Sequence, residues 1–339
     1  MLFLLFFFAT TLAQISPQRG QENQSNNEEL IVNTELVVVD VEVKNKNIGR
    51  NLGQLKKEDF SIYEDGVKQK ITHFSQDKLP LSIVLLLDTS GSVQPIIQHI
   101  HDGAVQALQR LKPEDEVALL AFATRTKLIQ DFTRDRQTVT DAIEKIKETE
   151  GLGGGTFLDE GIYQAAQHLH KSSNPSSRRI IIAITDNISS KGFLLLDGHS
   201  GAEALSEVFE SGAIVSGLVV GSWLSTTTNI MNTVFVWQKL LLSTSIENYT
   251  NKTGGEVMRA DKESIETKLS ELIDNLRTRY ALGYMPSNQK WDGKFRRIKV
   301  IVSPEVEKRE GKLVILTKRG YYGRHNDTVN HLLKNPAQA

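Results

Sequence analysis

Five oxygen-bearing side chains stand at places in the sequence where a metal ion could be held. They are Asp88, Ser90, Ser92, Thr156 and Asp186. Two carboxylates that come close together repel each other unless a positive charge lies between them. Hydroxyl groups add further oxygen ligands without adding charge. Such a small, all-oxygen set is typical of Mg²⁺ or Mn²⁺, and it is also compatible with Ca²⁺.

Composition excludes several other kinds of site. The 339 residues include no cysteine, which rules out thiolate catalysis, disulfides, iron–sulfur clusters and cysteine-bound zinc. With 40 Lys+Arg against 41 Asp+Glu the formal net charge is −1. A nucleic-acid-binding protein normally carries a basic face, so we expect no nucleic-acid partner. The sequence also lacks the lysine that would make residues 151–155 a phosphate-binding loop.

The serines and histidines do not form a recognisable catalytic arrangement. Ser90 and Ser92 lie outside any nucleophile-elbow pattern. The histidines of the pairs 99/101 and 168/170 are two residues apart on predicted helices, where they do not share a face. We therefore predict no catalytic residue, no organic cofactor and no enzyme activity.

Alternating strands and helices position the five oxygen ligands. Continuous apolar runs predict buried parallel strands over residues 82–88, 117–123, 179–186 and 213–221, with a shorter, more polar strand over 127–133. Helical spacing is found at residues 96–111, 137–147, 157–171, 202–210 and 265–276. This alternation predicts an α/β fold with a doubly wound, mostly parallel sheet. In such sheets ligands bind beyond the carboxyl ends of the strands, where Asp88 and Asp186 are expected.

Both flanks of this α/β region have a β pattern. Strands are predicted over residues 36–43, 60–63 and 67–74 before it, and over 280–284, 295–302 and 312–318 after it. Neither flank has enough strands to bury two faces alone. We therefore expect an N-terminal β segment (30–80) and a C-terminal β segment (280–323) to form one β-sandwich-like domain, with the α/β domain (81–279) inserted between them.

The two ends of the chain are expected to lie outside the folded domains. Residues 1–13 are apolar and uncharged, too short to cross a bilayer, and resemble the apolar region of a signal peptide. Residues 14–29 are polar and predict a disordered linker, and residues 324–339 predict a disordered tail. These features favour a secreted, periplasmic or cell-surface protein with no stable membrane span in the mature chain.

The ordered set of five residues resembles the metal-ion-dependent adhesion site of von Willebrand factor A domains, whose motif is Asp-x-Ser-x-Ser, a distant Thr and a distant Asp. Asp88, Ser90 and Ser92 match the first part, and Thr156 and Asp186 match the others. The family usually has glycine after the last aspartate, where this chain has an asparagine that tolerates left-handed backbone. Flanking segments such as Tyr-Glu-Asp-Gly (63–66), Tyr-Ala-Leu-Gly-Tyr (280–284) and Arg-Gly-Tyr (319–321) resemble bacterial secreted proteins related to this family.

This resemblance implies a non-enzymatic binding module. An Asp or Glu carboxylate of a protein partner would complete the coordination of the bound cation. Two alternatives stay open at this stage. One is a metal-dependent hydrolase or phosphoryl-transfer enzyme that uses the same cation as a Lewis acid. The other is a scaffold component of a surface assembly in which the metal is structural.

Overall fold

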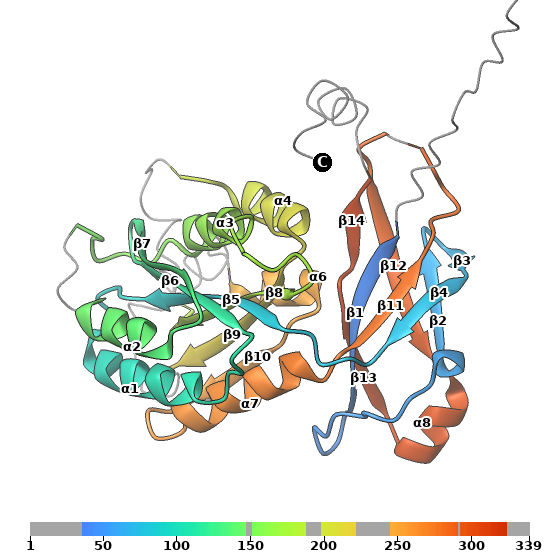
Figure 1. The fold of residues 1–339 in the computed structure, drawn as a ribbon, viewed down its shortest axis with the longest axis horizontal. Helices are drawn as coiled ribbons and strands as arrows, with labels where there is room; N and C mark the ends of the chain where they lie inside the picture. The colour runs from blue at the N-terminus through green and yellow to red at the C-terminus, as the bar shows by residue number, and fades with distance from the viewer. Residues whose placement is uncertain (1–35, 147–150, 188–197, 222–244, 291, 324–339) are drawn as a thin grey trace, which may run out of the picture. The chain divides into compact units, whose positions relative to one another are not determined.

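A six-stranded sheet forms the centre of the α/β part of the chain, residues 81–277 (Figure 1). The computed structural model describes residues 36–146, 151–187, 198–221, 245–290 and 292–323. The strand order is β10-β9-β8-β5-β6-β7. The strands are β5 (Leu81–Asp88), β6 (Glu116–Phe122), β7 (Thr126–Thr133), β8 (Arg178–Thr185), β9 (Ile214–Val220) and β10 (Val257–Ala260). All pairs are parallel except β6 with the edge strand β7, so the predicted mostly parallel α/β fold is confirmed.

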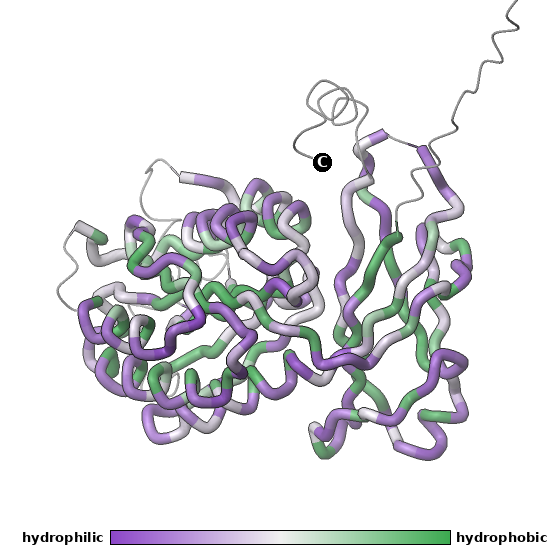
Figure 2. Tube along the Cα trace, viewed as in Figure 1, coloured by the Kyte–Doolittle hydropathy of each residue, from purple (hydrophilic) through white to green (hydrophobic). Residues whose placement is uncertain are grey.

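Helices cover both faces of this sheet because its strands are apolar on both sides. Ile83 and Leu85 point into one core, whereas Val84 and Leu86 point into the other. The first core is closed by α1 (Ile97–Leu108), α2 (Arg136–Lys145) and α7 (Ile265–Arg277). The second is closed by α3 (Leu158–Leu169), α4 (Gly201–Ser211) and α6 (Ile246–Thr253). Figure 2 shows the corresponding hydropathy, with hydrophobic residues concentrated along the central strands.

The strand order reverses direction between β5 and β8. From β5 the chain continues through α1 to β6 on one side, whereas from β8 it continues through α4 to β9 on the other. The carboxyl ends of β5 and β8 lie side by side, because Leu87 is paired with Ile184. A crevice outside the strand ends at such a reversal is the usual ligand position in open α/β sheets.

Two antiparallel four-stranded sheets form the β part of the chain, residues 37–75 and 280–322. One has the order β13-β1-β11-β4 and the other β14-β12-β2-β3, so each contains strands from both flanks. The strands are β1 (Val37–Asn45), β2 (Phe60–Glu64), β3 (Val67–Gln69), β4 (Ile71–Ser75), β11 (Tyr280–Tyr284), β12 (Phe295–Val302), β13 (Leu313–Thr317) and β14 (Gly320–Tyr322). One apolar core joins the sheets, as the β-sandwich prediction requires. The proposed boundaries of each segment stay predictions.

Three local expectations were incomplete. The strand predicted over residues 67–74 is interrupted at Lys70, and its halves belong to different sheets: β3 pairs with β2, and β4 pairs with β11. Alternation of apolar residues does not reveal such a crossing between sheets. Two short helices, α6 and α8 (Pro304–Glu310), were not predicted. Each is shorter than the three or more turns over which helical periodicity becomes clear.

The aromatic motifs of the flanks meet in the β core. The hydroxyls of Tyr284 and Tyr321 both donate to Oε2 of the buried Glu64, at 2.7 and 2.8 Å. The hydroxyl of Tyr280 donates to Leu52 O (2.6 Å) and accepts from Leu55 N (2.9 Å). These bonds satisfy polar groups that would be costly to bury unpaired, and they tie segments from both flanks into one core.

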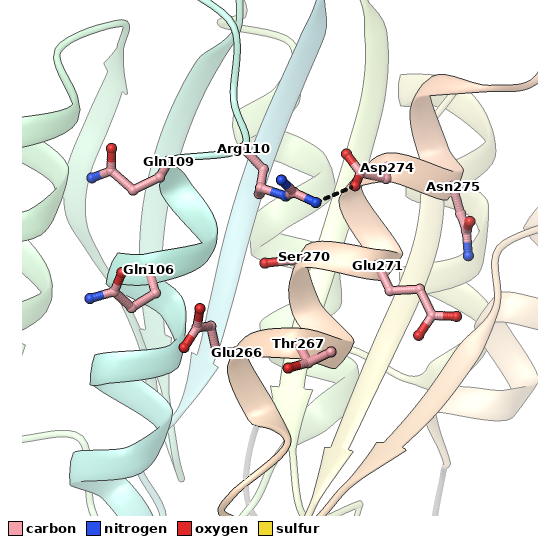
Figure 3. A pocket seen from close by; sticks show the side chains of 9 residues that line it. All are labelled: Gln106, Gln109, Arg110, Glu266, Thr267, Ser270, Glu271, Asp274 and Asn275. Carbon is pink, nitrogen blue, oxygen red and sulfur yellow. Dashed lines mark hydrogen bonds and ion pairs between the residues drawn. The ribbon is translucent and has the colours of Figure 1, made fainter.

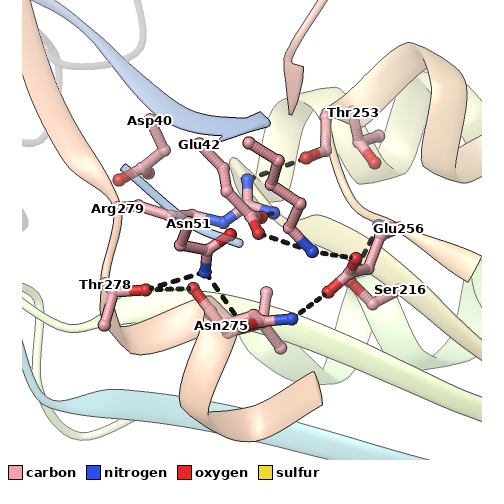
Figure 4. Close-up of polar contacts among 12 residues, drawn as sticks. Asp40, Glu42, Asn51, Ser216, Thr253, Glu256, Asn275, Thr278 and Arg279 are labelled. Atoms are coloured by element: carbon pink, nitrogen blue, oxygen red, sulfur yellow. Dashed lines mark hydrogen bonds and ion pairs between the residues drawn. The ribbon is translucent and has the colours of Figure 1, made fainter. Parts of the chain in front are cut away.

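Charged side chains join the α/β part to the outward face of β1. Arg178 pairs with Asp40 at 2.8 Å, and Arg279 Nη2 donates to Glu42 Oε2 at 2.6 Å. Arg279 and Glu42 are each only 1% exposed. Figure 4 shows the two side chains next to each other. Lys44 contacts Glu256, which follows α6. Alternate residues of β1 therefore face the apolar β core and this polar junction.

The structure does not test the predictions for the two ends of the chain. The predicted signal peptide (1–13), linker (14–29) and tail (324–339) lie outside the described residues. Within the described ranges, every helix is too short or too polar to span a bilayer.

We expect Glu42→Gln to destabilise the protein by about 3–5 kcal/mol, because it leaves the guanidinium of Arg279 buried without a counter-charge. The control is Asp274→Asn, which breaks the half-exposed pair with Arg110 (3.1 Å) and should cost about 0–1 kcal/mol. Urea unfolding of the three proteins measures both changes. Equal effects of the two substitutions would show that the buried junction contributes no more than a surface ion pair.

Candidate metal site at the carboxyl edge of the sheet

Asp88 is the last residue of β5, and its side chain is completely buried. Its Oδ1 accepts a hydrogen bond from the backbone N–H of Ser90 (2.9 Å), and its Oδ2 accepts one from the hydroxyl of Thr185 (2.5 Å). Both donors come from strand ends or the loop that follows. The carboxylate is therefore held in one orientation by neutral groups.

Ser90 and Ser92 follow in the loop between β5 and the 3-10 turn Gln94–Ile96. The two hydroxyl oxygens lie 3.2 Å apart; Ser90 is buried, whereas Ser92 is exposed. Both side chains therefore lie on the same side of the loop. This arrangement is the one that the alternation Asp-x-Ser-x-Ser predicts.

Asp186 directly follows β8 and is half-buried. Because β8 is the sheet neighbour of β5, Asp186 leaves the sheet beside Asp88, as the prediction required. The preceding residue, Thr185, is the donor to Asp88. The two aspartates therefore belong to one acidic edge.

Thr156 is buried, and it reaches the same edge through the glycine segment before it. Gly91 N donates to Gly154 O (3.1 Å), which connects this segment to the loop of Ser90 and Ser92. Gly155 N donates to Thr124 Oγ1 (3.0 Å), beyond the end of β6. Gly153 has φ +80°, and a Cβ there would lie 2.7 Å from Thr124 Oγ1. Only glycine fits that position without displacing the segment.

Burial changes the proton affinity of Asp88. Loss of solvent raises its pKa from 3.8 to about 6, and the negative charge of Asp186 adds a smaller effect in the same direction. The hydrogen bonds from Ser90 and Thr185 oppose this increase in pKa. A carboxylate in this environment gains stability from a nearby cation.

The donor set fits a hard divalent cation. It consists of two carboxylates and three hydroxyls, and such ions prefer oxygen ligands. The described residues contain no cluster of three or more His, Cys, Asp or Glu side chains suited to a metal. That finding is compatible with the predicted set, since three of its five members are Ser or Thr.

Two features of this edge were not predicted from the sequence: the hydrogen bond from Thr185 to Asp88 and the side-chain contacts of Asn187. Thr185 holds Asp88, but a threonine inside a buried strand gives no signal of its own. Asn187, which stands where the resembling family has glycine, adopts the left-handed region with φ 61°. Its side chain binds the first turn of α6: Oδ1 accepts from Ile246 N and Nδ2 donates to Glu247, both at 2.8 Å. These side-chain bonds of Asn187 could not be predicted because α6 itself was not predicted.

Two histidines of the pairs 99/101 and 168/170 contact carboxylates. His168 Nε2 lies 2.9 Å from Asp131, and His170 Nε2 lies 2.8 Å from Glu207. His101 is buried on α1. The contacts of His168 and His170 are to carboxylates outside the predicted metal-ligand set.

A groove of about 630 Å³ lies between α1 and α7, away from the strand ends that carry the predicted ligands. Figure 3 shows that its labelled side chains are polar, and Arg110 pairs with Asp274 across it. Small-molecule pockets are usually lined mainly by apolar and aromatic groups. This groove therefore does not compete with the carboxyl edge as the main candidate site.

Residues 83–189 match the family model described as "von Willebrand factor type A domain". All five predicted ligands lie within that range. An uncharacterized protein of Synechocystis sp. is 30% identical over 127 residues, which are 36% of this chain and 26% of that protein. The matched part of the chain thus spans about a quarter of the length of this relative.

Solved structures with similar folds were also found. BatB from Bacteroides thetaiotaomicron is 21% identical, and the match covers 58% of this chain and 98% of that one, with a TM-score of 0.41. Proximal thread matrix protein 1 from the mussel byssus, described with a zinc-occupied MIDAS motif, is 16% identical with a TM-score of 0.42. That match covers 60% of this chain and 49% of the mussel protein.

The raised pKa of Asp88 gives a pH dependence that can be measured without any metal. Because the pKa in the folded state is about 6 and the ordinary value is 3.8, the stabilisation from protonated Asp88 is fully present below about pH 4. It is lost as the pH rises through 6. In chelator, wild-type protein should lose about 2 kcal/mol between pH 4.5 and 7.5 relative to Asp88→Asn, which cannot ionise there. Parallel stability curves from urea unfolding would contradict the assigned environment of Asp88.

Proposed function

We propose that this protein is a divalent-cation-dependent protein-binding module. The match of residues 83–189 to the von Willebrand factor type A family model supports this proposal. In this proposal Asp88, Ser90, Ser92, Thr156 and Asp186 hold one Mg²⁺, directly or through water. Mn²⁺ or Ca²⁺ could take its place. An aspartate or glutamate of a partner protein completes the coordination.

The observation that carries the proposal is the burial of Asp88 at the edge it shares with Asp186. A fully buried carboxylate is costly unless a positive charge compensates it. The hydrogen bonds to Asp88 come from a backbone amide and a hydroxyl, and neither carries a charge. A divalent cation supplies the missing charge and can accept a further carboxylate from outside.

Binding, rather than catalysis, is the activity that these contacts favour. Ser90 and Ser92 bond to each other, and among the described residues no histidine is hydrogen-bonded to either hydroxyl. His168 and His170 instead contact Asp131 and Glu207. Hydrolase and phosphoryl-transfer activity therefore has no specific support from the described contacts.

The proposed place of action is outside the cytoplasm: secreted, periplasmic or at the cell surface. The support is the apolar, uncharged segment 1–13 followed by a polar segment. Expression of the full chain, followed by N-terminal sequencing of the exported product, tests this part of the proposal. Protein retained in the cytoplasm with residues 1–13 intact would contradict it.

Metal binding is expected to depend on Asp88. Calorimetry with Mn²⁺ should detect one site in the wild-type protein and none in Asp88→Ala, because the one remaining carboxylate, Asp186, and three neutral hydroxyls do not offset the dehydration of a divalent ion. Asp102→Ala, which removes an exposed acid on α1, is the control and should bind as wild type does. Equal affinities of wild type and Asp88→Ala would refute the site.

Thr156→Ala should weaken partner binding more than it weakens metal binding, because both carboxylate ligands remain. A partner is first captured by pull-down with Mg²⁺ and tested again in chelator. It is then titrated against wild type and Thr156→Ala at saturating Mg²⁺. Capture that persists in chelator would favour a scaffold with a structural metal. Turnover of phosphoester or ester substrates that is lost in Asp88→Ala would favour the enzyme alternative.

A further inference from the structure

We infer that Arg279, 93 residues beyond Asp186 in the chain, is a positioning residue for the metal site and acts on it through α6. The inference rests on the proposed function, since it concerns the same five ligands. Its basis is a continuous set of contacts from β1 to Asp88. The set passes through the two ends of α6.

At its N-terminal end, α6 is fastened to the residue that follows Asp186. The backbone N–H of Ile246 donates to Asn187 Oδ1, and Asn187 Nδ2 donates to Glu247 Oε2, both at 2.8 Å. Glu247 also accepts from Arg259 on β10 (2.9 Å). Asn187 is therefore held by its side chain in the left-handed conformation, with φ 61°.

From Asn187 the contacts continue to the first metal ligand. Asn187 N donates to Thr185 Oγ1 (3.0 Å), and the Thr185 hydroxyl donates to Asp88 Oδ2 (2.5 Å). A hydroxyl that accepts one bond and donates another is fixed in direction. A shift of Asn187 therefore changes the donor that orients Asp88, and it moves the adjacent Asp186 as well.

At its C-terminal end, α6 is fastened to the β part by Arg279. The Nη1 atom of Arg279 donates to Gly254 O, just after the last turn of α6, at 2.7 Å. Its Nη2 atom donates to Glu42 Oε2 on β1 at 2.6 Å. The planar guanidinium thus connects the end of α6 to β1 from a completely buried position, and Figure 4 shows it beside Glu42.

Both ends of α6 are closely packed against neighbouring backbone and side chains. A Cβ on Gly217 of β9 would lie 2.7 Å from Ile246, which shows how closely the first turn approaches the sheet. A Cβ on Gly255 would lie 1.8 Å from Val215 O, and one on Gly254 would lie 2.4 Å from the backbone of Thr317. Close-packed elements of this kind transmit displacement rather than damping it.

Arg277 provides a matched control. It lies two residues earlier, is also buried, and donates to Asp115 Oδ2 at the same distance of 2.6 Å. Its carboxylate partner precedes β6, at the amino edge of the sheet and away from α6. Lysine in place of either arginine keeps the charge but loses the fork that makes two directed bonds at once.

The experiment compares Arg279→Lys with Arg277→Lys by Mn²⁺ calorimetry and urea unfolding. Both variants should lose stability. Arg279→Lys should also bind Mn²⁺ at least about fivefold more weakly than wild type. A fivefold change in affinity is the lower end of the range typical of coupled sites. Arg277→Lys should stay within about twofold of wild type, as expected for an uncoupled position. Equal affinities for the two lysine variants would overturn the inference.

A second substitution separates positioning from general damage. Asn187→Gly accepts the same backbone conformation but removes both side-chain bonds to α6. In the Asn187→Gly background, Arg279→Lys should no longer change Mn²⁺ affinity, because the connection is already broken. An unchanged effect of Arg279→Lys in that background would show that it acts by another route.

Hydrogen exchange in chelator tests the connection independently of the metal. Arg279→Lys should speed exchange of the Asn187 and Ile246 amides, and Arg277→Lys should not. If the wild type binds no Mn²⁺ yet these amides respond, the proposed function fails and the connection through α6 stands. If the wild type binds Mn²⁺ and these amides do not respond, the connection fails and the proposed function stands.

Discussion

The carboxylate of Asp88, buried at the end of the central strand β5, is the constraint on which the architecture of this edge depends. An ionised group at that depth needs partners with fixed geometry, and each neighbouring segment contributes one. The loop after β5 supplies the Ser90 amide, and β8 supplies the Thr185 hydroxyl. The reversal of strand order between β5 and β8 brings the end of β5 next to Asp186, which follows β8. A buried carboxylate whose pKa is raised by loss of solvent would gain stability from a bound cation.

Local backbone conformation decides how the loops reach this carboxylate. Gly153 and Asn187 both adopt the left-handed region, one before Thr156 and one after Asp186. Glycine is needed at 153, where a side chain would collide with Thr124. Asparagine serves at 187 because its amide group forms two bonds to α6 that glycine could not form. Glycine at 153 and asparagine at 187 thus both adopt the left-handed conformation, and the asparagine side chain also links its loop to α6.

The junction between the α/β part and the β part is polar, although both parts have apolar cores. Buried ion pairs of this kind contribute little net stability, since desolvation offsets most of the attraction. They do, however, require a defined geometry, because displacement of one partner leaves the other charge buried and unpaired. The pairs Arg178–Asp40 and Arg279–Glu42 therefore favour one alignment of β1 against the α/β part. An apolar junction would tolerate sliding more readily.

The α/β class, the β flanks and the order of the candidate ligands could be predicted from the sequence. These depend on hydrophobic periodicity and on short motifs, which are local properties of the chain. The pairing of β5 with β8, and the division of residues 67–74 between two sheets, became known only from the folded structure. So did the connection of β1 to α6 by Arg279, with 237 residues separating Arg279 from Glu42. No local pattern encodes such pairs, because the energy that selects them comes from burying groups that only the folded chain brings together.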